Sequence, residues 1–349
     1  MTTSIQNHIN GRLSLRPPQA ESLARLRQAL TAAPEMLQKK WDVAAVLAKL
    51  KAVFPDLRDF EREFPSLCFA LATGVGKTRL MGAFIAYLHL THGISNFFVL
   101  APNLTIYNKL IADFTPNTPK YVFKGISEFS LNRPIVITGD TYENEGAALT
   151  DSLPQGFLHD IRINVFNISK INSEVRGGKE PRIKRMREVL GDSYFNYLAN
   201  LPDLVLLMDE SHRYRAQAGM RAINELNPLF GLELTATPFT ESHKGPVAFQ
   251  NVVMHYPLAQ AMHDGFVKMP AAVTQRDFNA KNYTSAEIEK IKLEDGVRLH
   301  ENTKAELQTY AHTNDVAVIK PFMLVIARDT THAAQLLALL ESGDFYGGR

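Results

Sequence analysis

The sequence contains a single cysteine, Cys68, among its 349 residues. One thiol cannot form a disulfide within the chain, so the class of small domains held together by internal disulfides is excluded. No window approaches ~18 uncharged apolar residues, and we therefore expect no transmembrane helix and no membrane partner. The N-terminus lacks a charged segment followed by an apolar run, so no signal peptide is expected. These absences favour a soluble, cytoplasmic protein.

The chain also lacks an excess of charge of either sign, with 38 Lys and Arg against 36 Asp and Glu. A net charge of +2 creates no global basic field, so a nucleic acid would have to be bound by a local surface. With 45% hydrophobic and 21% charged residues, the composition is that of a globular protein with a sizeable core. The length allows two or three domains at ~150 residues each.

A glycine turn that ends in Gly76-Lys77-Thr78 is the most informative stretch of the chain. The apolar residues 67–71 before it predict a buried strand, and the apolar spacing over residues 80–88 predicts a helix after it. A strand, a glycine turn and a helix are the context of a phosphate-binding loop. Lys77 would then reach the β- and γ-phosphates, and the Thr78 hydroxyl would hold Mg²⁺. The full pattern requires Gly where this chain has Leu71, and Gly-Lys-Thr also occurs in ordinary turns.

From residue 65 onward, apolar strands alternate with helical segments, which predicts a parallel sheet covered on both faces. The expected strands are residues 67–71, 96–100, 134–138, 161–167, 203–208 and 231–234. In such sheets ligands bind beyond the carboxyl ends of the strands. Each candidate motif follows the end of a strand, so we expect one shared site.

Two acidic residues, Asp209 and Glu210, follow the apolar strand 203–208. A carboxylate at this position can hold Mg²⁺, and we assign this to Asp209, through water. Glu210 would orient and deprotonate the attacking water. Alternatively, this is a polar turn in which Glu210 caps a helix.

A second polar turn, Thr235-Ala236-Thr237-Pro238, follows the strand 231–234. Its two hydroxyls could bond the carboxylates of the neighbouring strand end and relay the nucleotide state. Taken alone, this tetrapeptide is an ordinary turn.

The remaining segments are predicted in outline. Residues 1–64 are expected to be mainly helical, and residues 256–266 form a short helix. Residues 268–274 are expected as an edge strand, and two helical stretches, 286–293 and 303–311, lie in a polar connecting segment. A strand at 321–327 and a helix at 331–340 would open a second α/β domain. Residues 170–187 carry seven Lys or Arg and two acids, which fits either a solvated face or a surface that tracks phosphates.

The motifs at 71–78, 209–212 and 235–238 resemble motifs I, II and III of superfamily 2 helicases and translocases. The closest resemblance is to the helicase part of the type III restriction endonuclease Res subunit, which residues 99–110, 164–172 and 329–333 also resemble. The resemblance implies an α/β fold: a RecA-like P-loop NTPase domain with a parallel sheet flanked by helices. It divides the chain into a helical segment (1–64), a first RecA-like domain (65–262), a connecting segment (263–316) and the start of a second RecA-like domain (317–349).

The resemblance also implies roles for individual residues. Gln19 matches the glutamine that reads adenine. Lys77, Asp209 and Glu210 match catalytic positions, and Thr78 and Asp209 match the Mg²⁺ ligands. The nucleotide-binding positions are Thr73, Gly74, Val75, Gly76, Lys77, Thr78 and Arg79. Ala101, Pro102 and Asn103 match contacts to the nucleic-acid backbone, and His212, Thr235 and Thr237 match coupling positions. Ser211 stands where many relatives have alanine.

The implied function is that of an ATP-dependent motor on double-stranded DNA, with a modification methyltransferase subunit as partner and ATP and Mg²⁺ as cofactors. The alternatives are a nucleotide-switched binding module without turnover, which would not need Glu210, and an RNA helicase of the same superfamily. No segment resembles the later motifs that supply an arginine to the γ-phosphate, nor a nuclease domain. Because such an arginine contributes about 10³–10⁵ in rate, we expect this chain to bind ATP·Mg²⁺ but to hydrolyse it slowly.

Overall fold

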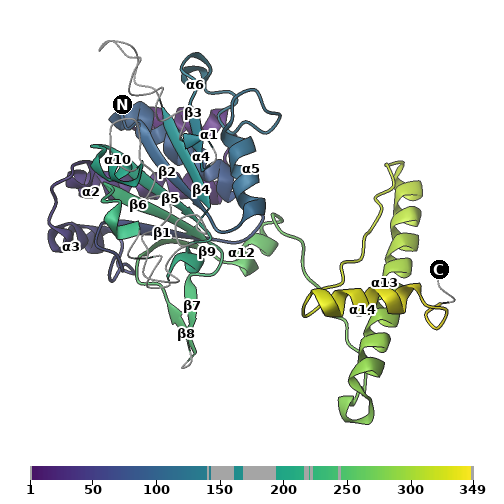
Figure 1. Cartoon of the computed structure of the whole chain (residues 1–349). Coiled ribbons are helices and arrows are strands. Elements are labelled where there is room, and N and C mark those ends of the chain that lie inside the picture. Colours follow the sequence, from purple (N-terminus) through teal and green to yellow (C-terminus); the bar gives the residue numbers. More distant parts are fainter. Residues whose placement is uncertain are drawn as a thin grey trace. The chain divides into compact units, whose positions relative to one another are not determined.

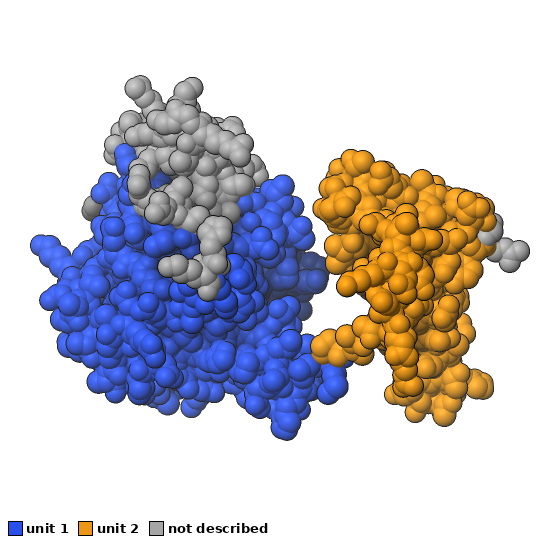
Figure 2. Space-filling model, turned by 90° about the horizontal axis from the view of Figure 1, so that it is seen from below, with its two compact units in different colours: residues 1–269 blue, residues 270–349 orange. Residues whose placement is uncertain are grey.

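The computed structural model describes residues 2–139, 141–142, 161–167, 194–215, 220, 223–242 and 245–346. The chain forms two compact units, Met1–Met269 and Pro270–Arg349 (Figure 2). The basic residues 170–187 lie outside the described part of the chain, as do residues 168–172 of the stretch that resembles the restriction family.

Unit 1 is built on a seven-stranded sheet in the order β3-β4-β2-β5-β6-β1-β9 (Figure 1). Every pair of neighbouring strands in it is parallel, so the expected fold class is confirmed. The strands are β1 (Ser66–Leu71), β2 (Asn96–Ala101), β3 (Ile135–Thr138), β4 (Arg162–Asn167), β5 (Leu204–Asp209), β6 (Phe230–Thr235) and β9 (Val252–Tyr256). All six strands expected from the sequence are present, within one or two residues at each end.

Alternate residues of strands such as β2, β4 and β5 enter two different cores, because side chains along a strand point to opposite faces. On β2, Phe97 and Val99 belong to the larger hydrophobic cluster, and Phe98 and Leu100 belong to the smaller one. A strand that is buried on both faces must be apolar throughout, which is why these segments stand out in the sequence.

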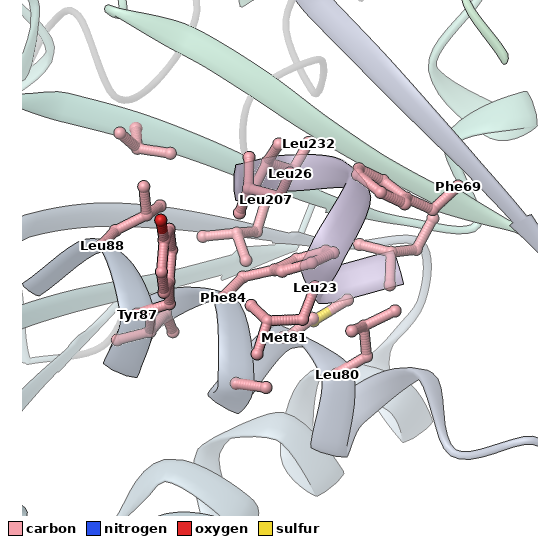
Figure 3. Close-up of a cluster of buried hydrophobic side chains, with 14 of the residues drawn as sticks. Leu23, Leu26, Phe69, Leu80, Met81, Phe84, Tyr87, Leu88, Leu207 and Leu232 are labelled. Carbon is pink, nitrogen blue, oxygen red and sulfur yellow. The ribbon is translucent and has the colours of Figure 1, made fainter. Parts of the chain in front are cut away.

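The larger core lies under α1 (Thr2–Arg12), α2 (Pro17–Ala32), α3 (Val43–Val53), α4 (Lys77–His92) and α5 (Leu104–Phe114). Leu23 and Leu26 of α2 gather with Phe84 of α4 and with Leu207 and Leu232 of the sheet (Figure 3). Each fully buried side chain of this size contributes about 1.5–3 kcal/mol. The N-terminal helices are therefore part of the body that carries the phosphate loop.

The smaller core lies on the opposite face, under α10 (Tyr194–Asn200) and the 3₁₀ helix η2 (Ser211–Tyr214). Tyr194 stacks near Phe166 and Tyr142, with ring centroids 6.0 Å and 4.9 Å away. Helix η2 begins directly after Glu210, so this core also supports the acidic pair. Two further short helices of unit 1 are η1 (Pro34–Leu37) and α6 (Ser127–Leu131).

The segment after residue 238 differs from the prediction. Two strands, β7 (Phe239–Ser242) and β8 (Gly245–Ala248), pair as an antiparallel hairpin that projects from unit 1 (Figure 1). The prediction of a helix over residues 256–266 is wrong at its start, because Tyr256 is the last residue of strand β9. The helix that forms, α12 (Leu258–His263), is shorter than the predicted one. Strand β9 forms because β1 offers it hydrogen bonds, pairing Leu71 with Tyr256.

Unit 2 is mainly helical and has its own small core of Leu293, Leu336 and Phe345. The two expected helical stretches form one helix, α13 (Ser285–Asn314), which begins with a capping box of Thr284 and Glu287. Helix α14 (Thr330–Glu341) confirms the helix expected over residues 331–340. The one other helix of the described part of unit 2 is the short 3₁₀ helix η3 (Ala280–Asn282).

The strands expected at residues 268–274 and 321–327 are not formed. Apolar sequence alone does not make a strand, since the backbone needs a neighbour to complete a ladder. In the second segment Phe322 and Ile326 are each 85% exposed. Among the helices that the structure describes, none combines the length and the apolar character needed to cross a bilayer.

Candidate nucleotide-binding site

The phosphate loop lies between the end of β1 at Leu71 and the start of α4 at Lys77. Gly74 and Gly76 have φ angles of +86° and +98°, a region that side chains rarely adopt. Both glycines and Thr73 are exposed, while Val75 is buried and fixes the loop to the core. The free N–H groups and the dipole at the start of α4 favour an anion here.

Gln19 of α2 contacts the backbone of this loop. Its Nε2 donates to the carbonyl oxygen of Gly76 at 2.8 Å, and its Oε1 accepts from the backbone N–H of Arg16 at 2.8 Å. Arg16 in turn donates from Nη1 to the carbonyl oxygen of Gly74 at 2.8 Å. Gln19 is 1% exposed, so its amide bonds the protein's own backbone in this structure. The start of α2 thus sets the shape of the loop.

The acidic pair meets the phosphate loop at the carboxyl edge of the sheet. The Nζ atom of Lys77 lies 3.1 Å from Oε1 of Glu210. Strand β1 leads into the loop before Lys77, and strand β5 ends just before Glu210. Both strands neighbour β6, which brings together residues that are far apart in the sequence. Glu210 has φ +50° and ψ +54°, a left-handed backbone that is strained for a residue other than glycine.

Asp209 is 6% exposed at the end of β5. Burial, followed by the neighbouring charge of Glu210, raises the pKa of Asp209 to about 6, although Lys77 opposes the shift. Crowded, partly dehydrated carboxylates of this kind attract a cation.

The residues present fit Mg²⁺. A carboxylate of Asp209 and a hydroxyl of Thr78 are the hard oxygen donors that this ion prefers. Within the described ranges there is no group of three or more His, Cys, Asp or Glu side chains able to hold a metal. A site with so few protein ligands suits an ion that keeps its waters and is completed by phosphates.

Lys109 of α5 was not among the predicted site residues. Its Nζ donates to Oγ1 of Thr78 at 2.8 Å and to Oδ2 of Asp113 at 2.7 Å. An ammonium group therefore contacts the hydroxyl that is predicted to bind the metal. The sequence signal was weak, because a lysine four residues before an aspartate is common on helix surfaces.

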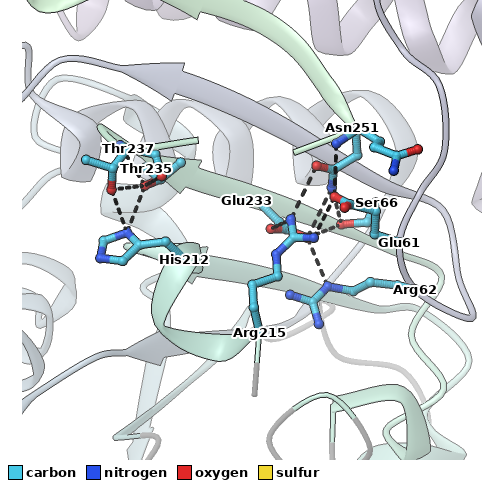
Figure 4. A network of polar contacts seen from close by, with 10 residues as sticks. Glu61, Arg62, Ser66, His212, Arg215, Glu233, Thr235, Thr237 and Asn251 are labelled. Atoms are coloured by element: carbon cyan, nitrogen blue, oxygen red, sulfur yellow. Dashed lines mark hydrogen bonds and ion pairs between the residues drawn. The ribbon is translucent and has the colours of Figure 1, made fainter. Parts of the chain in front are cut away.

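His212 contacts both threonines of the second polar turn (Figure 4). Its Nδ1 lies 3.0 Å from Oγ1 of Thr235 and 3.0 Å from Oγ1 of Thr237. The hydroxyls thus meet the histidine, and not the carboxylates that the sequence suggested. The same Nδ1 is 3.6 Å from Oε2 of Glu210, so His212 stands between the turn and the acidic pair. Burial lowers the pKa of His212, which favours the neutral ring.

A cavity of about 520 Å³ opens beside the start of α4. Gly76, Thr78, Arg79 and Lys109 line one side of it, and Arg12, Leu13, Lys120 and Lys124 line the other. Apart from Asp113, the charged residues of this lining are basic. A concave, positively charged space next to a phosphate loop suits the negatively charged phosphates of a nucleotide.

The predicted nucleic-acid residues follow β2 at the same edge of the sheet. Ala101 is buried at the strand end, and Asn103 is exposed. The side chain of Asn103 accepts from the backbone N–H of Ile106 at 2.9 Å and so caps α5. The structure thus gives Asn103 a local role at the start of a helix.

The parallel sheet, the glycine loop and the acidic pair define a P-loop nucleotide-binding domain. The family model for the type III restriction enzyme res subunit matches residues 12–240, well over half of the chain. The chain therefore belongs to the family of the type III restriction enzyme res subunit. This family assignment agrees with the helicase-like ATPase domain that the motifs at 71–78, 209–212 and 235–238 resemble.

Two solved structures are weakly similar. The SWI2/SNF2 ATPase core of Sulfolobus solfataricus, in complex with dsDNA, is 14% identical at a TM-score of 0.32, over 64% of this chain and 32% of that one. A nuclease-deletion mutant of the Type ISP restriction-modification enzyme LlaGI, in complex with a DNA substrate mimic, is 13% identical at a TM-score of 0.34, over 73% and 24%. The chain thus spans about a third and a quarter of their lengths. A comparison with curated proteins found no match.

Proposed function

We propose that this chain is the ATP-binding motor domain of a DNA-dependent ATPase of a type III restriction-modification system. The observation that carries the proposal is the 3.1 Å contact between Lys77 and Glu210, which joins the phosphate loop to a carboxylate that can act as a base. A loop that only bound phosphate would not need this carboxylate beside it.

In the proposed reaction the chain's own groups bind, orient and move a proton. The N–H groups of the loop and Lys77 would hold the β- and γ-phosphates, and Thr78 and Asp209 would hold Mg²⁺, which would neutralise charge on the phosphates. When Lys77 turns to the phosphates, its contact with Glu210 is released. The Glu210 carboxylate is then free to orient a water molecule and accept its proton.

The basic cavity beside α4 would take the negatively charged phosphates of the nucleotide. In this proposal Gln19 reads adenine by exchanging one of its backbone partners for the base, and Arg79 and Lys109 lie along the path of the phosphates. His212, Thr235 and Thr237 would transmit the nucleotide state, because they join the acidic pair to the turn after β6.

The proposed substrate track is double-stranded DNA, with contacts at Ala101, Pro102 and Asn103, and the proposed partner is a modification methyltransferase subunit. The N–H groups at the start of α5 can hold backbone phosphates without reading sequence. We further propose that residues 263–316 connect this motor domain to a second one that starts at residue 317. A motor on DNA of this kind would act in the cytoplasm.

The test is ATP binding and turnover by the full chain, with and without duplex DNA. Lys77→Ala should abolish binding, and Glu210→Gln should keep binding and abolish turnover. Lys49→Ala is the matched control, because Lys49 is an exposed lysine paired with Glu35 on another part of unit 1. Equal turnover by Glu210→Gln and the native chain would contradict the proposed base, and ATP binding that survives Lys77→Ala would contradict the proposed site. Binding without turnover in the native chain, with binding lost in Lys77→Ala, would fit half of a motor that needs an arginine from elsewhere, or a nucleotide-switched module.

A further inference from the structure

Helix η2 is fastened to strand β6 at two points. At its first turn, His212 contacts Thr235, and just beyond its end Arg215 contacts Glu233 (Figure 4). Thr235 and Glu233 are two residues apart on one strand and so share a face of the sheet. The first contact joins His212 and Thr235, which match coupling positions of the helicase family. The second involves residues to which neither the sequence nor the proposed function assigns a role.

Arg215 bonds two carboxylates and lies over an aromatic ring, while its buried Nε has no hydrogen-bond partner among the described residues. Its Nη2 donates to Oε2 of Glu233 at 2.8 Å, and its Nη1 donates to Oε2 of Glu61 at 2.6 Å. The guanidinium lies 3.7 Å above the ring centroid of Phe249, and its side chain is 9% exposed. A planar group bound on two edges and one face has little freedom to move.

The contacts of Arg215 with Glu61 and Glu233 form an anchor for the end of η2. Glu233 is the part of this anchor that lies in the sheet. It is fully buried in the middle of the sheet, paired with Cys68 of β1 and Met208 of β5. Its carboxylate accepts from Nε of Arg62 at 2.9 Å, from Oγ of Ser66 at 2.8 Å and from Nδ2 of Asn251 at 3.1 Å. A buried charge must be fully paired, so each of these groups holds the others in place.

The anchor matters because Glu210 has a strained backbone. Its left-handed φ of +50° lies at the junction of β5 and η2, and its carbonyl accepts from the N–H of Arg213 at 3.0 Å. Such a conformation persists only where the structure on both sides enforces it. On the upstream side β5 does this, since Asp209 pairs with Leu234 in the sheet. On the downstream side the polar side-chain contacts are those of His212 and Arg215, and Tyr214 between them is buried in the smaller core.

We propose that Arg215 is a positioning residue for the Glu210 carboxylate. By holding the end of η2 to Glu233, it keeps Glu210 in its left-handed conformation and directs the carboxylate toward Lys77. The proposal rests on the proposed function, in which Glu210 is the base. It differs from a purely stabilising role, because loss of Arg215 should impair the proton-accepting step more than nucleotide binding.

The first test measures hydrogen exchange of the backbone amides of residues 209–215 in the full chain. Arg215→Gln should speed exchange of the Arg213 amide at least tenfold, because the turn that protects it depends on the anchor. Arg25→Gln of α2 is the matched control: its guanidinium also bonds a carboxylate, that of Glu21, and in addition the backbone carbonyl of Val253. Unchanged exchange at residues 210–213 in Arg215→Gln would overturn the proposal.

The second test measures ATP turnover by the same variants. Arg215→Gln should lower kcat at least tenfold with KM within twofold of the native value, and Arg215→Lys should restore part of kcat because it keeps one charged contact. Equal losses in kcat and in the folded fraction, or an unchanged kcat, would overturn the proposal. If the native chain binds ATP without turnover, the exchange result alone decides. Failure of the proposed function would appear separately, as a native chain that binds no ATP.

Discussion

Lys77 and Glu210 form an ion pair of 3.1 Å across the carboxyl edge of the sheet, with side chains 11% and 21% exposed. In this arrangement each group neutralises the other, and ATP must compete with Glu210 for the lysine. We predict that Glu210→Gln raises the affinity for ATP about fivefold, since a pair of this exposure is worth about 1 kcal/mol. Titration with a fluorescent ATP analogue measures this. Weaker binding by the variant would mean that the Glu210 charge supports the nucleotide complex.

The phosphate loop gives a second prediction, on stability. A Cβ at Gly76 would lie 2.6 Å from Nε2 of Gln19, and the φ of +98° is unfavourable for alanine. Gly93 also has a positive φ, of +70°, but nothing lies within 4 Å of a Cβ there. Gly93→Ala should therefore cost about 1–2 kcal/mol from the backbone alone, and Gly76→Ala clearly more. Thermal unfolding of the two variants measures the difference. Equal losses of stability would show that the Gln19 side chain moves away from the added Cβ at little cost.

Acid sensitivity follows from the buried carboxylate. Burial alone would raise the pKa of Glu233, but Arg62 and Arg215, with the hydroxyl of Ser66, outweigh it and lower the pKa to about 2. Because the folded pKa lies below the ordinary value of 4.5, the ionised group stabilises the fold above pH 4.5, and this contribution is lost as the pH falls toward 2.

Glu233→Gln should therefore be destabilised by about 3–5 kcal/mol at neutral pH, since two arginines lose their partner. The difference from the native chain should shrink as the pH falls from 4.5 toward 2. Urea unfolding at several pH values tests this, with the exposed Glu306→Gln as a control. A difference that stays constant over this range would contradict the expected ionisation.

The contact of Lys109 with Thr78 leads to a prediction on Mg²⁺. An ammonium group and a metal ion on the same hydroxyl repel each other, so we expect Lys109 to leave Thr78 when the ion binds. We predict that Lys109→Met lowers the Mg²⁺ concentration needed for nucleotide binding two- to fivefold, an effect of about 1 kcal/mol. Lys51→Met, on an exposed position of α3, is the control. A higher Mg²⁺ requirement would instead assign Lys109 to the phosphates.

The strands were predictable because a sheet buried on both faces requires continuous apolar segments. Residues 204–208 are apolar without a break, and β5 forms there. Strand β9 was missed because it is short and because Tyr256 also fitted the spacing of the helix behind it. Its place depends on β1, which lies far away in the sequence. The opposite error occurred at residues 321–327, where an apolar segment has no strand beside it.

The site was predictable as far as its residues are neighbours in the sequence. Lys77 and Thr78, or Asp209 and Glu210, carry their chemistry in one short motif. The partners of Gln19 and Arg215 could not be predicted in this way. Gly76 lies beside Gln19 because of how α2 packs, and Glu233 lies beside Arg215 because of the order of the strands. Glu233 itself stood inside a predicted strand, where one carboxylate among apolar residues is a signal of a buried partner.

The burial of Cys68 has a practical consequence for labelling. The thiol lies fully inside the sheet, and burial raises its pKa well above the ordinary range, so it stays protonated and out of reach of reagents. Since the sequence has no other cysteine, we expect maleimide and nitroxide reagents not to label the native chain. A cysteine introduced at Leu131, which is 90% exposed, would be the one reactive thiol of the protein. The fluorescence or the spin-label mobility of a probe at this position could then follow ATP binding without first removing any native residue.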